Sequence, residues 1–381
     1  MLRVLTLATL FPNGARPELG VFVARQTRAL AAQPEVAVEV VAPLGLPVWP
    51  LSLHPRYAPL RKLPLSETVD GLVVHRPRYR IWPGPQGQAG TAARLASALL
   101  PLLCAIRRRF QFDVIDAEYF WPDGPAAMRL ADALGIPFSV KARGSDIHLW
   151  GARPAVRTQL IEAGKAAGGL LAVSGALKAD MAALGMPDEK IAVHHTGVDL
   201  DRFAPAAGKE QGARLIVVGH LIPRKGQDLA LRALATLPEA SLTLVGDGPE
   251  RARLEALAHQ LGLAGRVHFL GAQPHAALPG LIAAANVLVL PTVSEGLANV
   301  WVEALACGVP VVTSDVGGAR DVIDRPEAGR LVPREPEAIA AAVRALLADP
   351  PDPDKVREGA ARFSWDRNGA ELAAHLREIA S

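Results

Sequence analysis

The chain has 381 residues, of which half are apolar and about a fifth are charged, so we expect a globular protein with two domains. No apolar run approaches the roughly 20 residues that cross a bilayer, and the N-terminal MLRVLTLATLFPNG lacks the features of a signal peptide. The two cysteines, Cys104 and Cys307, indicate neither a disulfide framework nor a metal cluster. We therefore expect a cytoplasmic protein.

The net charge of +3 conceals an asymmetry between the two halves. Residues 1–203 hold 23 Lys and Arg against 17 Asp and Glu, whereas residues 204–381 hold 18 against 21. The basic side chains cluster at 56–62, 76–80 and 107–109. Such clusters are either a solvated basic face or a site for a phosphate-rich partner, such as the anionic inner face of a membrane. Nucleic acid is not expected, because no aromatic residues interleave with the charges.

Short β-branched runs alternate with longer Ala/Leu-rich amphipathic stretches along the chain. In the first half, strands are predicted at 2–8, 36–42, 113–117, 136–141, 169–173 and 191–195, and helices near 20–33, 91–110, 123–134 and 174–185. In the second half, strands are predicted near 213–219, 241–246, 266–270, 287–290 and 310–314, and helices near 225–237, 249–262, 274–285 and 299–307. This alternation predicts βαβ units and parallel sheets covered on both faces.

The periodicity lapses in VDLDRFAPAAGKEQGARL, and a new strand begins near residue 214. We therefore predict two doubly wound domains, 1–203 and 204–363, and a separate terminal helix at 364–381. Residues 44–90 are rich in Pro, Trp and Arg and show no regular pattern, so we expect loops there that contact an acceptor substrate. In doubly wound sheets, ligands bind beyond the carboxyl ends of the strands, so the loops at those ends are the candidate sites.

The most informative loop lies in LVLPTVSEGLANVWVEALACG, where a strand ends near Pro291 and a helix begins near Asn299. Exposed amides at a helix start suit a diphosphate, and Gly296 permits close approach of a ligand. Glu303 lies on an otherwise apolar helix, where a carboxylate needs a partner and can accept bonds from two hydroxyls. The alternative readings are that Glu295 is a helix-start acid and that Glu303 is solvated.

A second loop, VVGHLIPRKGQDL, follows a strand that ends at Gly219. Arg224 offers a guanidinium fork and Lys225 a point charge next to a helix start, which suits a nucleotide diphosphate. Both cations can stabilise a departing diphosphate without a metal. The alternative is a surface Arg-Lys pair.

Two further loops belong to the first half. FPNGARPELG follows the first strand and ends at Gly20, but it lacks the G-x-G-x-x-G spacing of a dinucleotide site. KARGSD places Arg143, Ser145 and Asp146 at the end of another strand, which suggests a sugar-facing loop on the acceptor side. The alternative is an Arg-Asp pair that closes a turn.

Together these stretches resemble the retaining glycosyltransferases of family 4, and the resemblance covers nearly the whole chain. It rests on five motifs, whose order and spacing are specific: EGLANVWVE at 295–303, GHLIPRKG at 219–226, VGDGP at 245–249, VSGALK at 173–178 and TGVDLDRF at 196–203. The resembled branch is that of teichuronic-acid and exopolysaccharide biosynthesis. The resemblance implies the GT-B fold, in which two Rossmann-like domains face a central cleft and the C-terminal helix crosses back to the N-terminal domain.

The resemblance also implies roles for individual residues. Arg224 and Lys225 would bind the donor diphosphate, near Gly219, and Glu303 would hold the ribose. Glu295 would lie against the donor sugar, beside the backbone of Gly296, Leu297 and Ala298. Gly20 would approach the phosphates, and the segment that includes Val267 and His268 would contact the base. We expect no metal or other cofactor.

Two departures from the family pattern stand out. Many members carry a histidine at the place of Arg143, and Thr196 replaces the usual Asn before Gly-Val-Asp. His194 and His195 precede that Thr, but adjacent strand residues point to opposite faces, so they do not suggest a metal site.

The implied reaction transfers a glycosyl group from a UDP-sugar or GDP-mannose to a hydroxyl of a glycan or lipid-linked acceptor, with retention at the anomeric carbon. Three alternatives stay open. Asp199-Leu200-Asp201 and Asp352-Pro353-Asp354 match the Asp-x-Asp of metal-dependent transferases, although both lie in connecting segments. A nucleotide-sugar 2-epimerase shares the architecture, and a non-catalytic nucleotide-sugar-binding protein would result if Arg143 marks lost chemistry.

Overall fold

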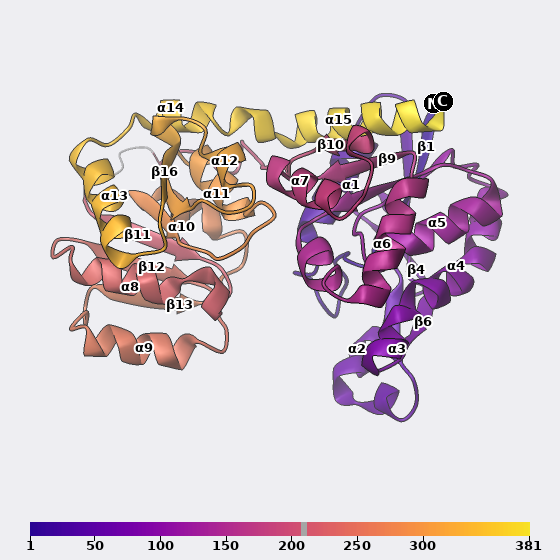
Figure 1. The fold of residues 1–381 in the computed structure, drawn as a ribbon, viewed down its shortest axis with the longest axis horizontal. Helices are drawn as coiled ribbons and strands as arrows, with labels where there is room; N and C mark the ends of the chain where they lie inside the picture. Colours follow the sequence, from indigo (N-terminus) through magenta and orange to yellow (C-terminus); the bar gives the residue numbers. More distant parts are fainter. Residues whose placement is uncertain (207–211) are drawn as a thin grey trace. The chain divides into compact units, whose positions relative to one another are not determined.

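The computed structural model describes residues 1–206 and 212–381, which form two α/β units (Figure 1). Unit 1 comprises Met1–Thr196 and Trp365–Ser381, and unit 2 comprises Gly197–Ser364. The division therefore falls before Gly197, earlier than the 203/204 boundary expected from the sequence. The reason is Phe203, which is fully buried and packs edge-on against the ring of His275 in unit 2, with centroids 5.5 Å apart.

Unit 1 contains an eight-stranded sheet with the order β10-β9-β8-β7-β1-β2-β5-β4. Its strands are β1 (Leu2–Leu7), β2 (Val36–Val41), β4 (Ser66–Val69), β5 (Leu72–His75), β7 (Val114–Ala117), β8 (Phe138–Ala142), β9 (Gly169–Ala172) and β10 (Ile191–Val193). All neighbours are parallel except β4 and β5, which pair antiparallel. The chain leaves β1 toward β2 on one side and returns to β7 on the other, so the topological switch point lies between β1 and β7.

The helices of unit 1 are α1 (Val21–Ala31), α2 (Ala58–Lys62), α3 (Gly84–Ala89), α4 (Thr91–Arg107), α5 (Asp123–Leu134), α6 (Pro154–Ala166), α7 (Gly175–Ala183) and α15 (Trp365–Ala380). Of these, α1, α5, α7 and α15 pack directly on strands of the sheet, whereas α4 packs on α5 and β6. The terminal helix α15 packs on α1, and Leu372 and Leu376 join Leu30 in one buried cluster. The approach is close, because a Cβ at Gly369 would lie 2.3 Å from the carbonyl oxygen of Ala29.

Within the described residues, one helical stretch, Gly84–Arg107, is long and apolar enough to cross a membrane by length and composition alone. It comprises α3 and α4, and 39% of its most apolar window is buried inside the protein. The buried side chains of α4 include Leu95, Leu99 and Leu103. The leucines and isoleucine of α4 are all buried or partly buried, so the helix packs on unit 1 with its large apolar side chains.

The segment 44–90, which the sequence pattern left as loops, contains regular structure. Besides β4 and β5 it holds a two-stranded parallel sheet of β3 (Leu44–Pro47) and β6 (Arg78–Ile81). The strand β3 reads Leu-Gly-Leu-Pro and shows no alternation, and β6 reads Arg-Tyr-Arg-Ile and alternates over only four residues, which is too short to identify a strand by itself.

Unit 2 contains a six-stranded, fully parallel sheet with the order β13-β12-β11-β14-β15-β16. Its strands are β11 (Arg214–Val218), β12 (Ser241–Val245), β13 (Val267–Gly271), β14 (Val287–Leu290), β15 (Val311–Ser314) and β16 (Gly329–Val332). Its helices are α8 (Gln227–Ala235), α9 (Arg251–Gln260), α10 (Leu278–Ala283), α11 (Asn299–Ala306), α12 (Ala319–Val322), α13 (Pro336–Ala348) and α14 (Pro353–Glu358). The predicted α/β class with parallel sheets is confirmed.

Candidate functional site

The switch point of unit 2 lies between β11 and β14, which are neighbours in the sheet but far apart in the chain. The loops that follow these two strands are joined by a backbone hydrogen bond, in which Val293 N–H donates to the carbonyl of Arg224 at 2.8 Å. Gly226 permits the contact: its φ is +72°, and a Cβ there would lie 2.3 Å from the carbonyl oxygen of Pro291. The topology therefore brings two candidate loops of the sequence together.

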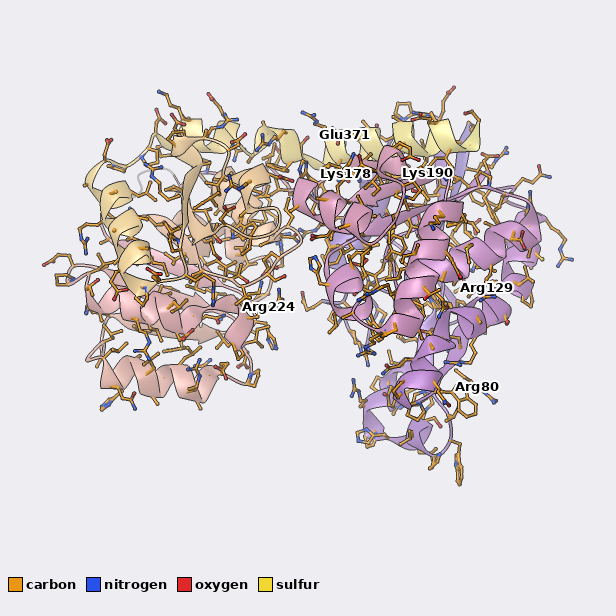
Figure 2. The ribbon with its side chains drawn as sticks, in the orientation of Figure 1. Arg80, Arg129, Lys178, Lys190, Arg224 and Glu371 are labelled. Atoms are coloured by element: carbon orange, nitrogen blue, oxygen red, sulfur yellow. The ribbon has the colours of Figure 1, made fainter. Side chains whose placement is uncertain are left out.

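Glu295 is the centre of the polar contacts between these loops. Its Oε1 accepts a hydrogen bond from Lys225 Nζ at 2.5 Å and from Thr292 Oγ1 at 3.2 Å. Arg224 Nη1 lies 3.5 Å from the same oxygen and also donates to the carbonyl of Ser294. The side chains of Glu295 and Lys225 are 12% and 15% exposed, whereas that of Arg224 is 46% exposed and lies at the surface of unit 2 (Figure 2). Two cations share one carboxylate, so the site keeps one surplus positive charge for an anionic ligand.

The backbone that carries Glu295 is fixed by the loop after β15. Gly317 has a φ of +51°, and a Cβ there would lie only 1.6 Å from the carbonyl oxygen of Glu295. Gly318 N–H donates to the carbonyl of Gly296 at 2.9 Å. Leu297 and Ala298 are buried, and α11 begins directly after them with no side-chain cap on Ala298. The amides of the first turn of α11 thus point outward beside Glu295, which suits an anion.

Glu303 lies on α11 with its side chain only 11% exposed, so it is not a solvated helix residue. Its Oε1 lies 3.0 Å from Nε2 of His275, which belongs to the segment between β13 and α10. His275 is therefore a neighbour of the candidate site that no sequence motif indicated.

The VGDGP motif forms the loop after β12, which contacts the loop after β11 beside the candidate site. Gly219 N–H donates to the carbonyl of Val245 at 2.9 Å, and a Cβ at Gly246 would lie 2.0 Å from the carbonyl oxygen of Gly219. A Cβ at Gly248 would lie 2.4 Å from the carbonyl oxygen of Leu221. The loops after β11 and β12 thus touch backbone to backbone, which requires glycine at these positions.

In unit 1, Arg143 follows β8 but does not reach freely into solvent. Its side chain is 6% exposed, forms an ion pair with the buried carboxylate of Glu118, and lies over the ring of Phe22 at 4.8 Å. Its Nε donates to the carbonyl of Glu118 at 3.1 Å. Nη1 of Arg143 is buried without a hydrogen-bond partner in the described structure.

Asp146, which the sequence suggested as sugar-facing, is fully buried. Its carboxylate accepts hydrogen bonds from the amides of Phe120, Arg143 and Gly144 at 2.8 to 3.1 Å. That expectation is wrong, because all of these bonds hold the loop together and leave the carboxylate no free face. Ser145 is exposed and shares a hydrogen bond of 2.8 Å with the hydroxyl of Tyr119.

A buried polar network lies beneath α1 and α15 in unit 1. Lys141 Nζ donates to Gln26 Oε1 at 2.7 Å and lies 2.7 Å from Nδ1 of His194. Since Nε2 of His194 lies 2.9 Å from the carbonyl of Asn368, that nitrogen donates and Nδ1 accepts from Lys141. Burial lowers the pKa of Lys141 well below its ordinary value, and it lowers the pKa of His194 as well. His194 is thus a hydrogen-bonded member of this buried network.

These features can be compared with known proteins. Residues 19–202 match the family described as Glycosyltransferase Family 4, and residues 201–363 match Glycosyl transferases group 1. A GDP-mannose-dependent alpha-(1-6)-phosphatidylinositol monomannoside mannosyltransferase of Mycobacterium tuberculosis is 31% identical over 71% of this chain and 78% of its own length. TuaC of Bacillus subtilis, named as a teichuronic acid biosynthesis glycosyltransferase, is 28% identical over 90% of this chain and 88% of its own.

The chain is a family 4 glycosyltransferase. Solved structures agree on the fold: sucrose-phosphate synthase of Thermosynechococcus elongatus has a TM-score of 0.77 at 21% identity, covering 100% of this chain and 99% of that one. The Anabaena protein HepE, solved with UDP and glucose, has a TM-score of 0.72 at 20% identity and covers 99% and 100% of the two chains. The predicted GT-B fold is thereby confirmed.

Two residues expected on the donor side of this glycosyltransferase lie at the start of a strand. Val267 and His268 lie at the amino end of the edge strand β13, whose carboxyl end is Gly271. Four residues of strand separate Val267 from that end, or about 13 Å. Val267 and His268 therefore lie away from the edge of the sheet where Lys225 and Glu295 lie, and their expected contact with the base stays a prediction.

Gly20 precedes α1 in this glycosyltransferase with a φ of +69°, and a Cβ there would lie 2.3 Å from the carbonyl oxygen of Leu10. The close packing accounts for a glycine, and its expected approach to phosphates stays a prediction. The Asp-x-Asp segments have local partners: Asp199 accepts from Arg202 N–H at 3.0 Å, and Asp352 from Asp354 N–H at 2.9 Å. Among residues 1–206 and 212–381, no group of three or more His, Cys, Asp and Glu side chains is arranged to hold a metal.

Proposed function

We propose that this glycosyltransferase transfers a sugar from a nucleotide-sugar donor to an acceptor hydroxyl, with retention at the anomeric carbon and without a metal ion. The observation that carries the proposal is the cluster of Lys225, Arg224 and Glu295 at the switch point of unit 2. Its surplus positive charge and the adjacent helix start suit a diphosphate, and the carboxylate suits the hydroxyls of a sugar.

The roles follow from these positions. Arg224 and Lys225 bind the diphosphate, and they neutralise the charge that builds up on it as the glycosidic bond breaks. Glu295 binds the donor sugar beside the backbone of Gly296, Leu297 and Ala298. Glu303, fixed by His275 at 3.0 Å, binds the ribose hydroxyls.

In the proposed reaction, the bond between the anomeric carbon and the diphosphate oxygen breaks as a bond to the acceptor oxygen forms on the same face. The acceptor's proton passes to an oxygen of the leaving diphosphate. Glu295 is not proposed as the nucleophile, because its role is to bind the hydroxyls of the donor sugar, with Oε1 oriented by Lys225 at 2.5 Å and by Thr292 at 3.2 Å.

The donor is proposed to be a UDP-sugar or GDP-mannose, and the acceptor a glycan or lipid-linked saccharide used in cell-surface polysaccharide synthesis. The relatives support this range, since one is named as GDP-mannose-dependent and another for teichuronic acid biosynthesis. For such acceptors we propose a cytoplasmic protein with peripheral contact to the inner face of the membrane. Arg143 and Ser145 are proposed to act on the acceptor side.

The test is a screen of thermal stabilisation and slow donor hydrolysis with UDP-, GDP- and ADP-sugars in EDTA. One nucleotide should raise the melting temperature of the wild type, and the effect should vanish in Glu303→Ala and Arg224→Ala. Arg344→Ala, an exposed residue of α13, is the control and should respond like the wild type. Binding that requires added Mn²⁺ would contradict the metal-independent site. An epimerised donor without transfer would indicate a 2-epimerase, and binding without turnover a non-catalytic protein.

A further inference from the structure

The exposed apolar side chains of unit 1 are concentrated in one segment. Among the described residues, ten large hydrophobic side chains are exposed, and five of them lie between residues 49 and 82: Trp49, Leu51, Leu53, Leu65 and Trp82. Trp49 is 77% exposed and Trp82 is 51% exposed. Burial normally removes such residues from water, so a group of this kind marks a contact surface.

The small sheet of β3 and β6 explains why the two tryptophans are neighbours. The strands are parallel, and Pro47 pairs with Ile81, so the chain leaves both strands at the same end. Trp82 directly follows β6, and Trp49 follows β3 after one intervening residue. Figure 1 shows β6, α2 and α3 gathered at one end of unit 1.

The same end of unit 1 is strongly basic. Residues 49–94 contain seven Lys and Arg against two Asp and Glu. A pocket of about 440 Å³ between β6 and α4 is lined by Arg78, Arg80 and Arg94, together with Trp82 and Ser97. Arg78 and Arg94 donate to backbone carbonyls and so fix the wall of the pocket. The exposed Arg80 offers its guanidinium to a phosphate, and the indole of Trp82 offers an apolar wall for what is attached to it.

The helix α4 borders this surface through Arg94 and Ser97, which line the pocket. Its large apolar side chains are buried or partly buried, so the helix adds no exposed apolar face. The exposed apolar area comes instead from the tryptophans and leucines of 49–82. Such side chains next to Arg are the composition that suits the interface between lipid headgroups and acyl chains.

We propose that Trp49, Trp82 and the arginines of the β6–α4 pocket form one docking surface for an anionic phospholipid bilayer. The pocket takes a lipid phosphate, and the tryptophans enter the headgroup layer. This proposal rests on the proposed function in placing the acceptor at a membrane, and it assigns the contact to defined residues of unit 1. The membrane is favoured over an acidic protein because apolar and basic side chains are mixed on the same surface.

The test is flotation of the full chain with vesicles of phosphatidylcholine alone and of phosphatidylcholine with 30% phosphatidylglycerol. We expect binding to the anionic vesicles, and weaker binding in high salt. Arg80→Glu should lower the partition coefficient roughly 25-fold, since each positive charge near an anionic surface contributes about fivefold. Trp49→Ala with Trp82→Ala should lower it roughly tenfold or more, because aromatic area is no longer buried.

Arg129→Glu is the matched control, since it makes the same charge change on α5 of unit 1, away from Arg80 (Figure 2). It should change the partition coefficient little. The proposal is overturned if the wild type does not float with anionic vesicles, or if Arg80→Glu and Arg129→Glu reduce binding equally. Nucleotide stabilisation of the same variants, measured without vesicles, should equal that of the wild type, so a failure here is distinguishable from a failure of the donor site.

Discussion

The ammonium of Lys225 lies 2.5 Å from Oε1 of Glu295, although the two residues are 70 positions apart and follow different strands. Both side chains are largely buried, so each charge depends on the other. Arg224, at 3.5 Å from the same oxygen, is more exposed and completes an arrangement of two cations around one carboxylate. A substitution of Glu295 and a substitution of Lys225 should therefore have different effects on the site.

Glu295→Gln should strengthen the binding of a free nucleoside diphosphate and at the same time weaken transfer. The change removes the negative charge that Lys225 and Arg224 share, so both cations become available to the diphosphate. The sugar hydroxyls lose a charged acceptor, and we expect kcat to fall at least about 30-fold. Calorimetry with UDP and GDP and steady-state kinetics measure the two effects. Weaker diphosphate binding in this variant would contradict the proposed charge arrangement.

Gly317→Ala should weaken donor binding by more than the strain of placing alanine at a positive φ would cause by itself. Its φ is +51°, and the added Cβ would lie 1.6 Å from the carbonyl oxygen of Glu295, so the loop must shift. Gly262→Ala is the matched control, because its φ is +67° but nothing lies within 4 Å of the added Cβ. The control should cost only about 1 kcal/mol. Equal melting temperatures and equal donor KM in both variants would show that the contact with Glu295 does not matter.

His275→Ala should raise the donor KM several-fold and leave kcat nearly unchanged. His275 lies 3.0 Å from Glu303, and it fixes a carboxylate that is proposed to bind the ribose, which does not react. Loss of binding energy that is equal in ground state and transition state appears in KM. A fall in kcat with an unchanged KM would instead place Glu303 at the reacting atoms.

Five of the six parallel strands of unit 2, β11 to β15, and the loops after β11 and β14 could be predicted from the sequence, because these strands are compact apolar runs and β11, β12 and β14 are followed directly by glycine or proline. The edge strand β16, which reads Gly-Arg-Leu-Val, is not predicted, because it has no such pattern. The same reasoning could not place Val267, since a motif located by position along the chain does not say at which end of a strand it lies. Asp146 was misjudged for a related reason. A polar residue after a strand can face solvent or cap its own loop, and only the burial of its carboxylate decides between these.

The network around Lys141 could not be predicted either. The sequence FSVKA reads as a strand with one polar residue, and the partners Gln26 and His194 come from elements 115 and 53 residues away. Likewise, β3 and β6 pair across about thirty residues. Those residues hold the β4–β5 hairpin with its Asp70-Gly71 turn, but no local signal that the chain returns to β3. Long-range pairing of short segments is therefore where sequence patterns fail, and in this protein it forms the proposed membrane-docking surface.

The ion pair between Arg143 and Glu118 separates a structural role of Arg143 from a functional one. Both side chains are buried, so Arg143→Gln alone leaves an unpaired carboxylate and should destabilise unit 1 by about 3 kcal/mol or more. Adding Glu118→Gln removes that charge and should restore most of the melting temperature. If Arg143 acts on the acceptor side, transfer stays low in the double variant although its fold is recovered. Recovery of both stability and transfer would show that Arg143 only holds the loop.

His375 on α15 should make the stability of unit 1 sensitive to acid. Its Nε2 shares a hydrogen bond of 2.8 Å with Ser139 Oγ, and burial lowers its pKa from 6.5 to about 4. Between these values the unfolded chain binds a proton that the folded chain does not, so stability falls as the pH drops from 6.5 toward 4, by up to about 3 kcal/mol. His375→Gln removes this effect.

The melting temperature of His375→Gln, measured relative to the wild type, should therefore be higher at pH 5 than at pH 7.5. At pH 7.5 the wild type and the variant both carry a neutral side chain at position 375. The melting temperature of the variant then reflects only the cost of altered packing. At pH 5 the wild type alone must keep a histidine deprotonated to stay folded. His259→Gln, a change of an exposed histidine in α9, is the control for the loss of a histidine as such. A difference between His375→Gln and the wild type that does not change with pH would mean that the protonation of His375 is not coupled to the folding of unit 1.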